Sequence, residues 1–304
     1  MITRRLQKNI AWIDLESPTQ DEIRTVAKEF GLNPLVVHEL SAPTLKPRVD
    51  LYGTYVYLIL HFPYLKRERG GTPTQEIDFI VGKKFFITVR YGSSEVFHLF
   101  SKMFEASSVL GKSTFGPHAG FIFFHLCRRL YETLLNELAI TNESLKQIEE
   151  NIFSGNEREM VQSLSHVARN LLDFKRSLAL HHDVLESFEV AGKKMFGEAF
   201  GFHLRTLIGE YYRVKQAVDG NIAFLAELRE TNNSLLTTKQ GETMKVLTIM
   251  AFVTFPLSLI ASIFGMNTQH TPIVGMFGDF WIVIFIMVLL TISFFWFFRH
   301  KKWL

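Results

Sequence analysis

The sequence predicts an α+β protein: an N-terminal α/β domain, a helical hairpin, and a long stalk helix that continues into the first of two C-terminal transmembrane helices. Strand-like runs of β-branched and aromatic residues are confined to the first third of the chain. Apolar residues then recur at intervals of three and four, as in amphipathic helices, and two uncharged stretches of 19 residues follow. The expected divisions are the α/β domain (1–116), the hairpin (117–201), the stalk (202–245), the first span (246–264), an outer loop (265–279), the second span (280–298) and a basic tail (299–304).

The first helix of the α/β domain has a start signal that can be read from the sequence. We expect Ser17 to be its N-cap, Pro18 its first helical residue and Gln20 the residue that completes a capping box. The helix should end at Gly31. Asn33-Pro34 repeats the cap-and-proline pattern, so a short second helix should begin there.

Four runs in the same domain are typical of strands, because they are rich in β-branched and aromatic residues and are bounded by turn formers. Turns that contain glycine separate the later runs, which favours hairpin connections. We therefore expect a small, partly antiparallel sheet with helices. The runs are residues 10–15, 55–62, 76–81 and 85–90.

The middle of the chain is predicted to be helical. Two periodic segments are separated by Ser154-Gly155-Asn156, so we expect them to form a hairpin. A third periodic segment begins near Phe202 or Leu204 and contains no proline before Pro256. A single helix of about 60 residues would be about 90 Å long. Such a helix must pack on copies of itself or stand as a stalk.

Each of the two uncharged stretches is long enough, as a helix, to cross the hydrocarbon core of a bilayer. Trp281 and Trp296 lie near the ends of the second stretch, where amphipathic rings favour the membrane interface. Helices buried in a soluble core rarely run this long without a charge, which disfavours that alternative. The connection between the spans has no Lys or Arg, so both termini should face the cytoplasm. The flanking basic residues are Lys239, Lys245, Arg299, Lys301 and Lys302.

Composition excludes several classes of protein. The chain has 33 Lys and Arg against 30 Asp and Glu, so it lacks the excess of basic residues that nucleic-acid binding requires. Its single cysteine, Cys127, can form neither an internal disulfide nor a cysteine-rich zinc site, and is expected in the core. We find no phosphate-binding loop, zinc-protease motif or nucleophile elbow, so we do not expect an enzyme. His181-His182-Asp183 is interpreted as a solvated helix face, since adjacent helical residues diverge by about 100°.

Gly265-Met266-Asn267 directly follows the first span. With the preceding string MKVLTIMAFVTFPLSLIASIF and the terminal KKWL, it resembles the CorA family of divalent-cation channels. The resemblance implies a funnel-shaped homopentamer in the inner (plasma) membrane, with five first spans lining one axial pore. It further implies passive uptake of Mg²⁺, with Co²⁺ or Ni²⁺ as surrogates, and no cofactor. Gly265, Met266 and Asn267 would then form the selective ion entrance.

Two spans in each chain cannot enclose an ion path, so a channel requires several copies, and cyclic symmetry is the usual solution. One face of the first span must then line the pore. Steps of three and four residues along the helix give a stripe whose outer half is small or hydroxylated. The alternative is that Met244 and Leu247 are ordinary packing residues. The stripe is Glu230, Met244, Leu247, Ala251, Phe255, Ser258 and Ser262.

Asn267 is the residue we expect to matter most. Mg²⁺ loses its water reluctantly, so an entrance that selects it should offer neutral oxygens that hydrogen-bond the hydration shell. A ring of Asn267 side chains with the Gly265 carbonyls would do this. Rings of large apolar side chains deeper in the pore can gate it by dewetting.

The chain departs from the family pattern at several positions. Its outer loop has no carboxylate before Asp279, so it should concentrate cations weakly. Alignment by eye places His38, Arg128 and Thr206 where family members carry acidic residues that sense Mg²⁺, and leaves only Glu39 as a possible regulatory ligand. Our hypothesis is that Mg²⁺ sensing between subunits is weakened or rebuilt here.

Two other functions remain open. A proton-coupled Zn²⁺ transporter of the ZntB type is favoured by the missing carboxylates and by His270 in the outer loop, and disfavoured by the intact glycine-methionine-asparagine triplet. A non-conducting, membrane-anchored scaffold is favoured by the loss of acidic positions. Replacement of Asn267 separates these functions, because a scaffold would not depend on it.

Overall fold

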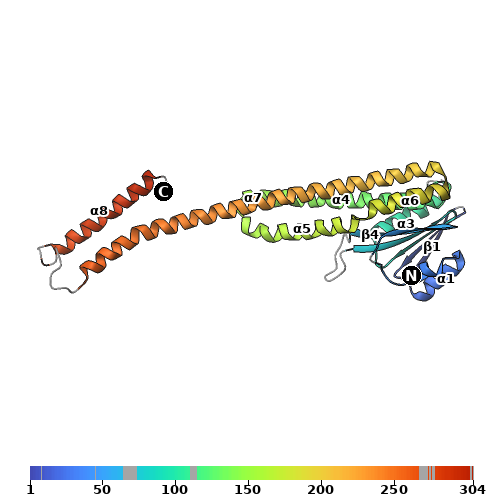
Figure 1. The fold of residues 1–304 in the computed structure, drawn as a ribbon, viewed down its shortest axis with the longest axis horizontal. Helices are drawn as coiled ribbons and strands as arrows, with labels where there is room; N and C mark the ends of the chain where they lie inside the picture. The colour runs from blue at the N-terminus through green and yellow to red at the C-terminus, as the bar shows by residue number, and fades with distance from the viewer. Residues whose placement is uncertain are drawn as a thin grey trace. The chain divides into compact units, whose positions relative to one another are not determined.

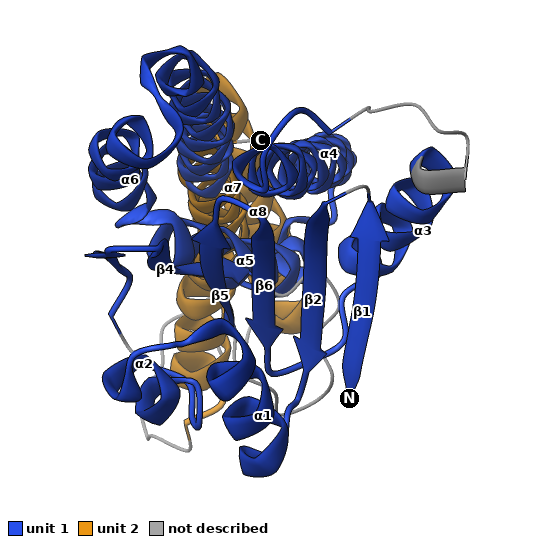
Figure 2. Ribbon diagram, turned by 90° about the vertical axis from the view of Figure 1, so that its right-hand side faces the viewer, with its two compact units in different colours: residues 1–229 blue, residues 230–304 orange. Residues whose placement is uncertain are grey.

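The computed structural model describes residues 1–7, 9–44, 46–63, 74–109, 115–266, 273, 275, 278–301 and 303. The chain divides into two compact units, Met1–Arg229 and Glu230–Leu304. Figure 1 labels the elements along the chain, and Figure 2 colours the two units. The fold is mixed α+β and mostly helical, as predicted.

The first unit contains a six-stranded sheet with the order β1-β2-β6-β5-β4-β3. Only the β2–β6 pair is parallel, so the expectation of a partly antiparallel sheet is confirmed. The strands are β1 (Ile2–Gln7), β2 (Ile10–Glu16), β3 (Arg48–Tyr52), β4 (Tyr55–Pro63), β5 (Thr74–Gly82) and β6 (Phe85–Arg90). The four predicted strands correspond to β2, β4, β5 and β6. The sequence analysis missed both edge strands, β1 and β3.

Helices cover both faces of the sheet (Figure 2). Apolar residues of α1 (Gln20–Phe30) and α2 (Pro34–Glu39) share one buried core with inward-facing residues of the sheet. On the other face, Trp12 of β2 contacts rings of α3 (Glu95–Val109), and Phe79 of β5 contacts Phe123 of α4 (Gly120–Phe153). The sequence analysis did not predict α3.

The start of α1 corrects our prediction. The N-cap is Thr19 and not Ser17: the Thr19 hydroxyl accepts from the Glu22 backbone N–H at 3.3 Å, and the Glu22 carboxylate accepts from the Thr19 N–H at 2.9 Å. Ser17 has a positive φ of 42°, and its N–H donates to the Arg90 carbonyl at 2.8 Å, so it belongs to the turn that leaves the sheet. Gly31 ends the helix with φ 62°, as expected.

The hairpin also differs from the prediction, because its second arm is two helices, α5 (Glu157–Leu178) and α6 (His181–Phe196). The chain turns at Ala179 and Leu180, and this turn places His181 in the interior. There its imidazole hydrogen-bonds the Tyr131 hydroxyl of α4 and the His61 carbonyl of β4. A single uninterrupted helix would forgo these contacts.

The long helix α7 (Glu198–Phe264) begins earlier than expected, directly after Gly197, whose φ is 97°. Within the first unit its buried residues recur at alternating steps of three and four, the spacing of closely packed helices. Asn221 is the polar member of this series; its amide donates to the Leu138 carbonyl at 2.9 Å and accepts from Asn142 at 3.0 Å. The apolar members are Leu204, Leu207, Tyr211, Val214, Val218, Leu225 and Leu228.

The second unit contains the remainder of α7 and the helix α8 (Asp279–His300). Both carry apolar windows long enough to cross a membrane. Only 6% of the α7 window and none of the α8 window is buried by the protein itself. Extensive apolar surface of this kind suits contact with lipid or with further copies of the chain.

Candidate pore face and ion entrance

The stripe predicted to line a pore lies on an open face of α7. Met244, Leu247 and Phe255 expose 57%, 54% and 74% of their surfaces. Ser258, Ser262 and Glu230 are also exposed, and Ala251 is half-buried. One face of the helix thus presents large apolar residues first and two hydroxyls near its outer end.

The other side of the same helix is the side that the chain covers. Ile249 is buried, and the partly covered positions that follow it lie about 180° around the helix from the stripe. They are Val253, Pro256, Leu257, Ile260 and Phe264. The stripe is therefore free to meet water or a second copy of the chain.

The threonine hydroxyls of this span donate hydrogen bonds to backbone carbonyls of the same helix. Thr248 donates to the Met244 carbonyl at 2.7 Å and Thr254 to the Met250 carbonyl at 2.9 Å. Pro256 has no N–H, so the Phe252 carbonyl loses its usual helical donor. Ser258 and Ser262 therefore remain as the exposed hydroxyls of the stripe.

The first span ends at the predicted triplet. α7 stops at Phe264, the Gly265 N–H donates to the Ala261 carbonyl at 2.9 Å, and the Met266 N–H donates to the Ile263 carbonyl at 3.3 Å. Both residues are exposed. Asn267 and His270 lie outside the described residues, so their roles remain predictions.

Glu39, the candidate regulatory ligand, is held by an arginine. It is the last residue of α2, and its carboxylate forms an ion pair with Arg48, which also contacts Asp50 at 2.8 Å. Burial alone would lower the pKa of Arg48, but Asp50 and Glu39 raise it. The cation that faces Glu39 is thus a guanidinium.

Two of the other aligned positions, Arg128 and Thr206, are also occupied by contacts within the chain. The exposed Arg128 pairs with Glu132 at 3.3 Å, and the Thr206 hydroxyl donates to the Phe202 carbonyl at 3.0 Å. Among the residues that the structure describes, no group of three or more His, Cys, Asp or Glu side chains is placed to hold a metal ion.

The sequence analysis interpreted His181 as part of a solvated helix face, and the structure shows that this interpretation is wrong. His181 is fully buried, whereas His182 is half-buried and Asp183 is exposed. Burial lowers the pKa of His181 to about 4, so the ring is neutral at physiological pH. It is a structural link between β4, α4 and α6.

This buried imidazole should make folding stability depend on pH. The pKa of His181 is 6.5 when unfolded and about 4 when folded, so its contribution is complete above pH 6.5 and is lost as the pH falls toward 4. The loss should reach about 3 kcal/mol. Thermal unfolding of His181→Gln between pH 4 and 7.5 should show a smaller slope with pH than the wild type, because glutamine keeps a donor and an acceptor but does not titrate.

The matched control is the adjacent histidine. His182→Gln makes the same replacement one residue further along α6, at a half-buried ring, and leaves the buried His181 in place, so the slope that depends on His181 should remain. Part of the slope should survive in His181→Gln, since burial also lowers the pKa of His118 to about 4. Equal slopes in the His181→Gln and His182→Gln variants would contradict the assignment.

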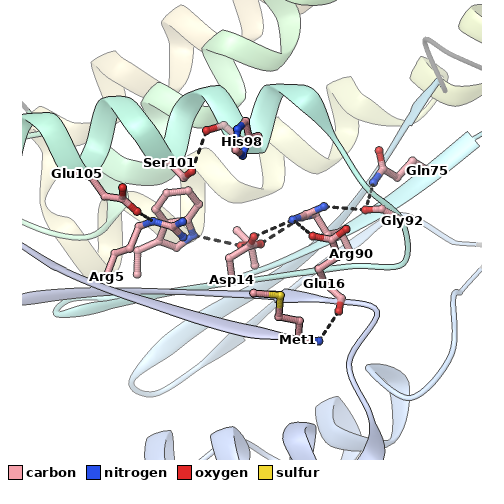
Figure 3. Close-up of polar contacts among 12 residues, drawn as sticks. Met1, Arg5, Asp14, Glu16, Gln75, Arg90, Gly92, His98, Ser101 and Glu105 are labelled. Atoms are coloured by element: carbon pink, nitrogen blue, oxygen red, sulfur yellow. Dashed lines mark hydrogen bonds and ion pairs between the residues drawn. The ribbon is translucent and has the colours of Figure 1, made fainter.

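The sequence analysis also missed a buried polar network between the sheet and α3 (Figure 3). Arg90 of β6 pairs with Asp14 at 3.0 Å and with Glu16 at 2.7 Å, and the Thr88 hydroxyl donates to Asp14 at 2.7 Å. The Arg90 guanidinium lies 5.0 Å from the centre of the Phe97 ring of α3. The available signal was acidic residues in the apolar strand β2 and a single arginine at the end of the apolar strand β6. These contacts join β2, β6 and α3.

Residues 7–301 match the family described as CorA-like Mg²⁺ transporter protein. The chain is 21% identical to the cobalt/magnesium transport protein CorA of Thermotoga maritima, over 96% of this chain and 83% of that protein. Its fold is similar to the complete structure of the CorA magnesium transporter from Methanocaldococcus jannaschii (TM-score 0.84, 19% identity, 97% and 92% of the chains). The ZntB cytoplasmic domain from Vibrio parahaemolyticus is similar over less of the chain (TM-score 0.62, 13% identity, 77% and 90%).

Proposed function

Because the chain belongs to the CorA-like Mg²⁺ transporter family, we propose that it is a channel for Mg²⁺, with Co²⁺ and Ni²⁺ as surrogates. Permeation is passive, driven by the ion gradient and the membrane potential. The observation that carries this proposal is the exposed stripe on α7, a helix that ends at Phe264, directly before the exposed Gly265 and Met266. The transport function of the relatives named above supports the same class of ion.

The assembly we propose is a homopentamer whose first spans surround one axial pore. The two apolar windows cross the inner (plasma) membrane, in contact with lipid, and both termini face the cytoplasm. In this arrangement the covered side of α7 faces away from the axis and the stripe faces inward. Copies of the chain would then bury the large apolar side chains that a single chain leaves open.

Ion selection would occur at the outer mouth. Asn267 side chains and Gly265 carbonyls would hydrogen-bond the hydration shell of Mg²⁺ without removing it. Neutral oxygens hold the ion weakly enough to release it, which conduction requires. Below the mouth, Ser262 and Ser258 offer exposed hydroxyls, and Phe255, Leu247 and Met244 form apolar constrictions that close the path by dewetting.

Glu39 should contribute little to regulation by Mg²⁺. Its carboxylate is paired with Arg48, and a metal ion would have to displace a guanidinium. We therefore expect Glu39→Gln to change the Mg²⁺ concentration that half-closes the channel by less than about twofold, as for a partly exposed ion pair. The measurement is flux at increasing Mg²⁺ on the cytoplasmic side. Loss of closure in this variant alone would show that Glu39 is a sensor.

A second function, proton-coupled Zn²⁺ transport, is favoured by one observation: the outer loop has no carboxylate before Asp279. Flux into proteoliposomes separates the two functions. We expect Mg²⁺ flux that is indifferent to an imposed pH gradient and exceeds Zn²⁺ flux. Zn²⁺ flux that follows the proton gradient would instead establish the second function, and no flux of either ion would favour a scaffold.

A further inference from the structure

Two carboxyl side chains lie buried on the face of the sheet that α2 covers. Glu76 and Asp78 are two residues apart on β5, so they point to the same face, and they expose 5% and 0% of their surfaces. Glu76 contacts the segment that leaves α2 at Thr44, and Asp78 is linked to Leu40 of the same segment through the Tyr91 hydroxyl. This pair, which we call the β5 carboxyl pair, takes no part in the ion path proposed above.

Glu76 fastens the segment at Thr44. One carboxylate oxygen accepts from the Thr44 backbone N–H at 2.5 Å, and the other accepts from the Thr44 hydroxyl at 3.3 Å. His61 of β4 completes the clamp: its Nε2 donates to the Thr44 carbonyl at 2.8 Å and lies 3.2 Å from Glu76. Thr44 is thus bound through its N–H, its carbonyl and its side chain.

Asp78 fastens the end of α2 through Tyr91. The Tyr91 hydroxyl lies 3.1 Å from Asp78 Oδ2 and 3.3 Å from the Leu40 carbonyl oxygen. Tyr57 donates to the other oxygen of Asp78 at 3.3 Å. A hydroxyl has one hydrogen, so Tyr91 cannot donate to both acceptors. A proton on Asp78 removes the conflict, because Asp78 then donates to Tyr91 and Tyr91 donates to Leu40.

The charged groups that face the β5 carboxyl pair also favour a protonated carboxyl. The ion-pair partner of Glu76 is His61, and within the described residues no cationic side chain hydrogen-bonds Asp78. The remaining charges near Tyr57, on α2 and β3, pair with one another: Arg48 contacts both Glu39 and Asp50. Burial and then the charge of Glu76 raise the pKa of Asp78 well above its usual value, while the tyrosine hydrogen bonds lower it less. Because the Tyr91 hydroxyl faces two acceptors and Glu76 accepts from Thr44, Asp78 is the carboxyl on which we place the proton.

We propose that the β5 carboxyl pair shares one proton and acts as a switch: with the proton the sheet holds the end of α2 and the segment to Thr44, and without it the segment is released. Loss of the proton places two negative charges in the interior beside one imidazole, and leaves either the Leu40 carbonyl or Asp78 Oδ2 without the Tyr91 hydrogen. The folded protein loses this proton only when the pH rises through the raised pKa of Asp78. Release is thus a response to rising pH.

Hydrogen exchange and infrared spectroscopy of the full-length protein test this switch. Wild-type protein at neutral pH should show the C=O stretch of a protonated carboxylic acid, and Asp78→Asn should lose it. As the pH rises, exchange of the Thr44 amide in the wild type should become about tenfold faster than in Asp78→Asn at the same pH. The asparagine amide donates to Tyr91 at any pH, so that variant stays fastened. Asp50→Asn, a half-exposed carboxylate on β3, should behave as the wild type.

If Asp78→Asn folds poorly, Glu76→Gln tests the same switch. Glu76→Gln removes the neighbouring charge but keeps an acceptor for the Thr44 N–H, so the acid band of Asp78 should disappear at a lower pH than in the wild type. The switch is overturned if the wild type has no acid band at neutral pH. It is equally overturned if the band is unmoved in Glu76→Gln, or if Thr44 exchange has the same pH dependence in the wild type and Asp78→Asn.

Discussion

Replacing Asn267 with alanine should lower Mg²⁺ flux into proteoliposomes by at least about a hundredfold, since each charge-assisted hydrogen bond lost is worth about 1.5–3 kcal/mol. In the proposed pentamer every subunit contributes one amide oxygen to the hydrated ion, so one substitution removes the whole ring. The protein should still fold and assemble, because the substitution lies beyond Phe264, the last residue of α7, and leaves the sequence of the sheet and its helices unchanged. Flux measured with equal amounts of assembled protein tests the expectation.

Two further variants show whether the amide chemistry is responsible. Met266→Leu changes the preceding exposed side chain without altering any oxygen, and should keep most of the flux. Asn267→Asp keeps an oxygen ring but adds charge, so the ion should bind more tightly and leave more slowly. Undiminished flux in Asn267→Ala would remove the entrance from our proposal. Loss of flux in Met266→Leu as well would indicate that the turn, and not the amide, is what matters.

The central strands could be predicted because burial on both faces leaves long apolar runs in the sequence. The edge strands could not, since β1 and β3 contain Arg4, Arg5 and Arg48, and their hydrogen-bonding partners lie on one side only. The error at α1 has a local cause: Ser17 and Thr19 are both good N-caps, and only the hydrogen bond between Ser17 and Arg90 of β6 excludes the first.

In the candidate site, too, some features could be predicted from the sequence and others depend on tertiary contacts. Helical geometry alone determines which residues share the stripe on α7, so residue spacing was sufficient to list them; their place along a pore stays a prediction. The pairing of Glu39 with Arg48 joins α2 to β3 and depends on how the chain folds back, which spacing does not reveal. Glu76 and Asp78 did leave a signal, two acidic residues at alternate positions in an apolar strand, and the sequence analysis overlooked it.

Replacing Leu247 with asparagine should raise basal Mg²⁺ flux about tenfold, because a leucine side chain favours an apolar environment over water by about 1.5–3 kcal/mol. Leu247 is 54% exposed on the open face of α7, and in the proposed pentamer it forms one of the apolar constrictions. A ring of asparagines would hold water where a ring of leucines excludes it, so the closed state would leak. The measurement is basal Mg²⁺ flux into proteoliposomes, compared with that of the wild type under the same gradient.

Leu257 provides the matched control, because it lies on the partly covered side of the same helix. Leu257→Asn introduces the same chemical change away from the proposed axis, so basal flux should stay low even where assembly is weakened. Leu247→Ile keeps the ring apolar and should also stay closed. If both asparagine variants leak equally, the effect is loss of packing and not wetting of a pore. If only Leu257→Asn leaks, the pore faces the other side of α7, and the stripe from Met244 to Ser262 is a packing surface.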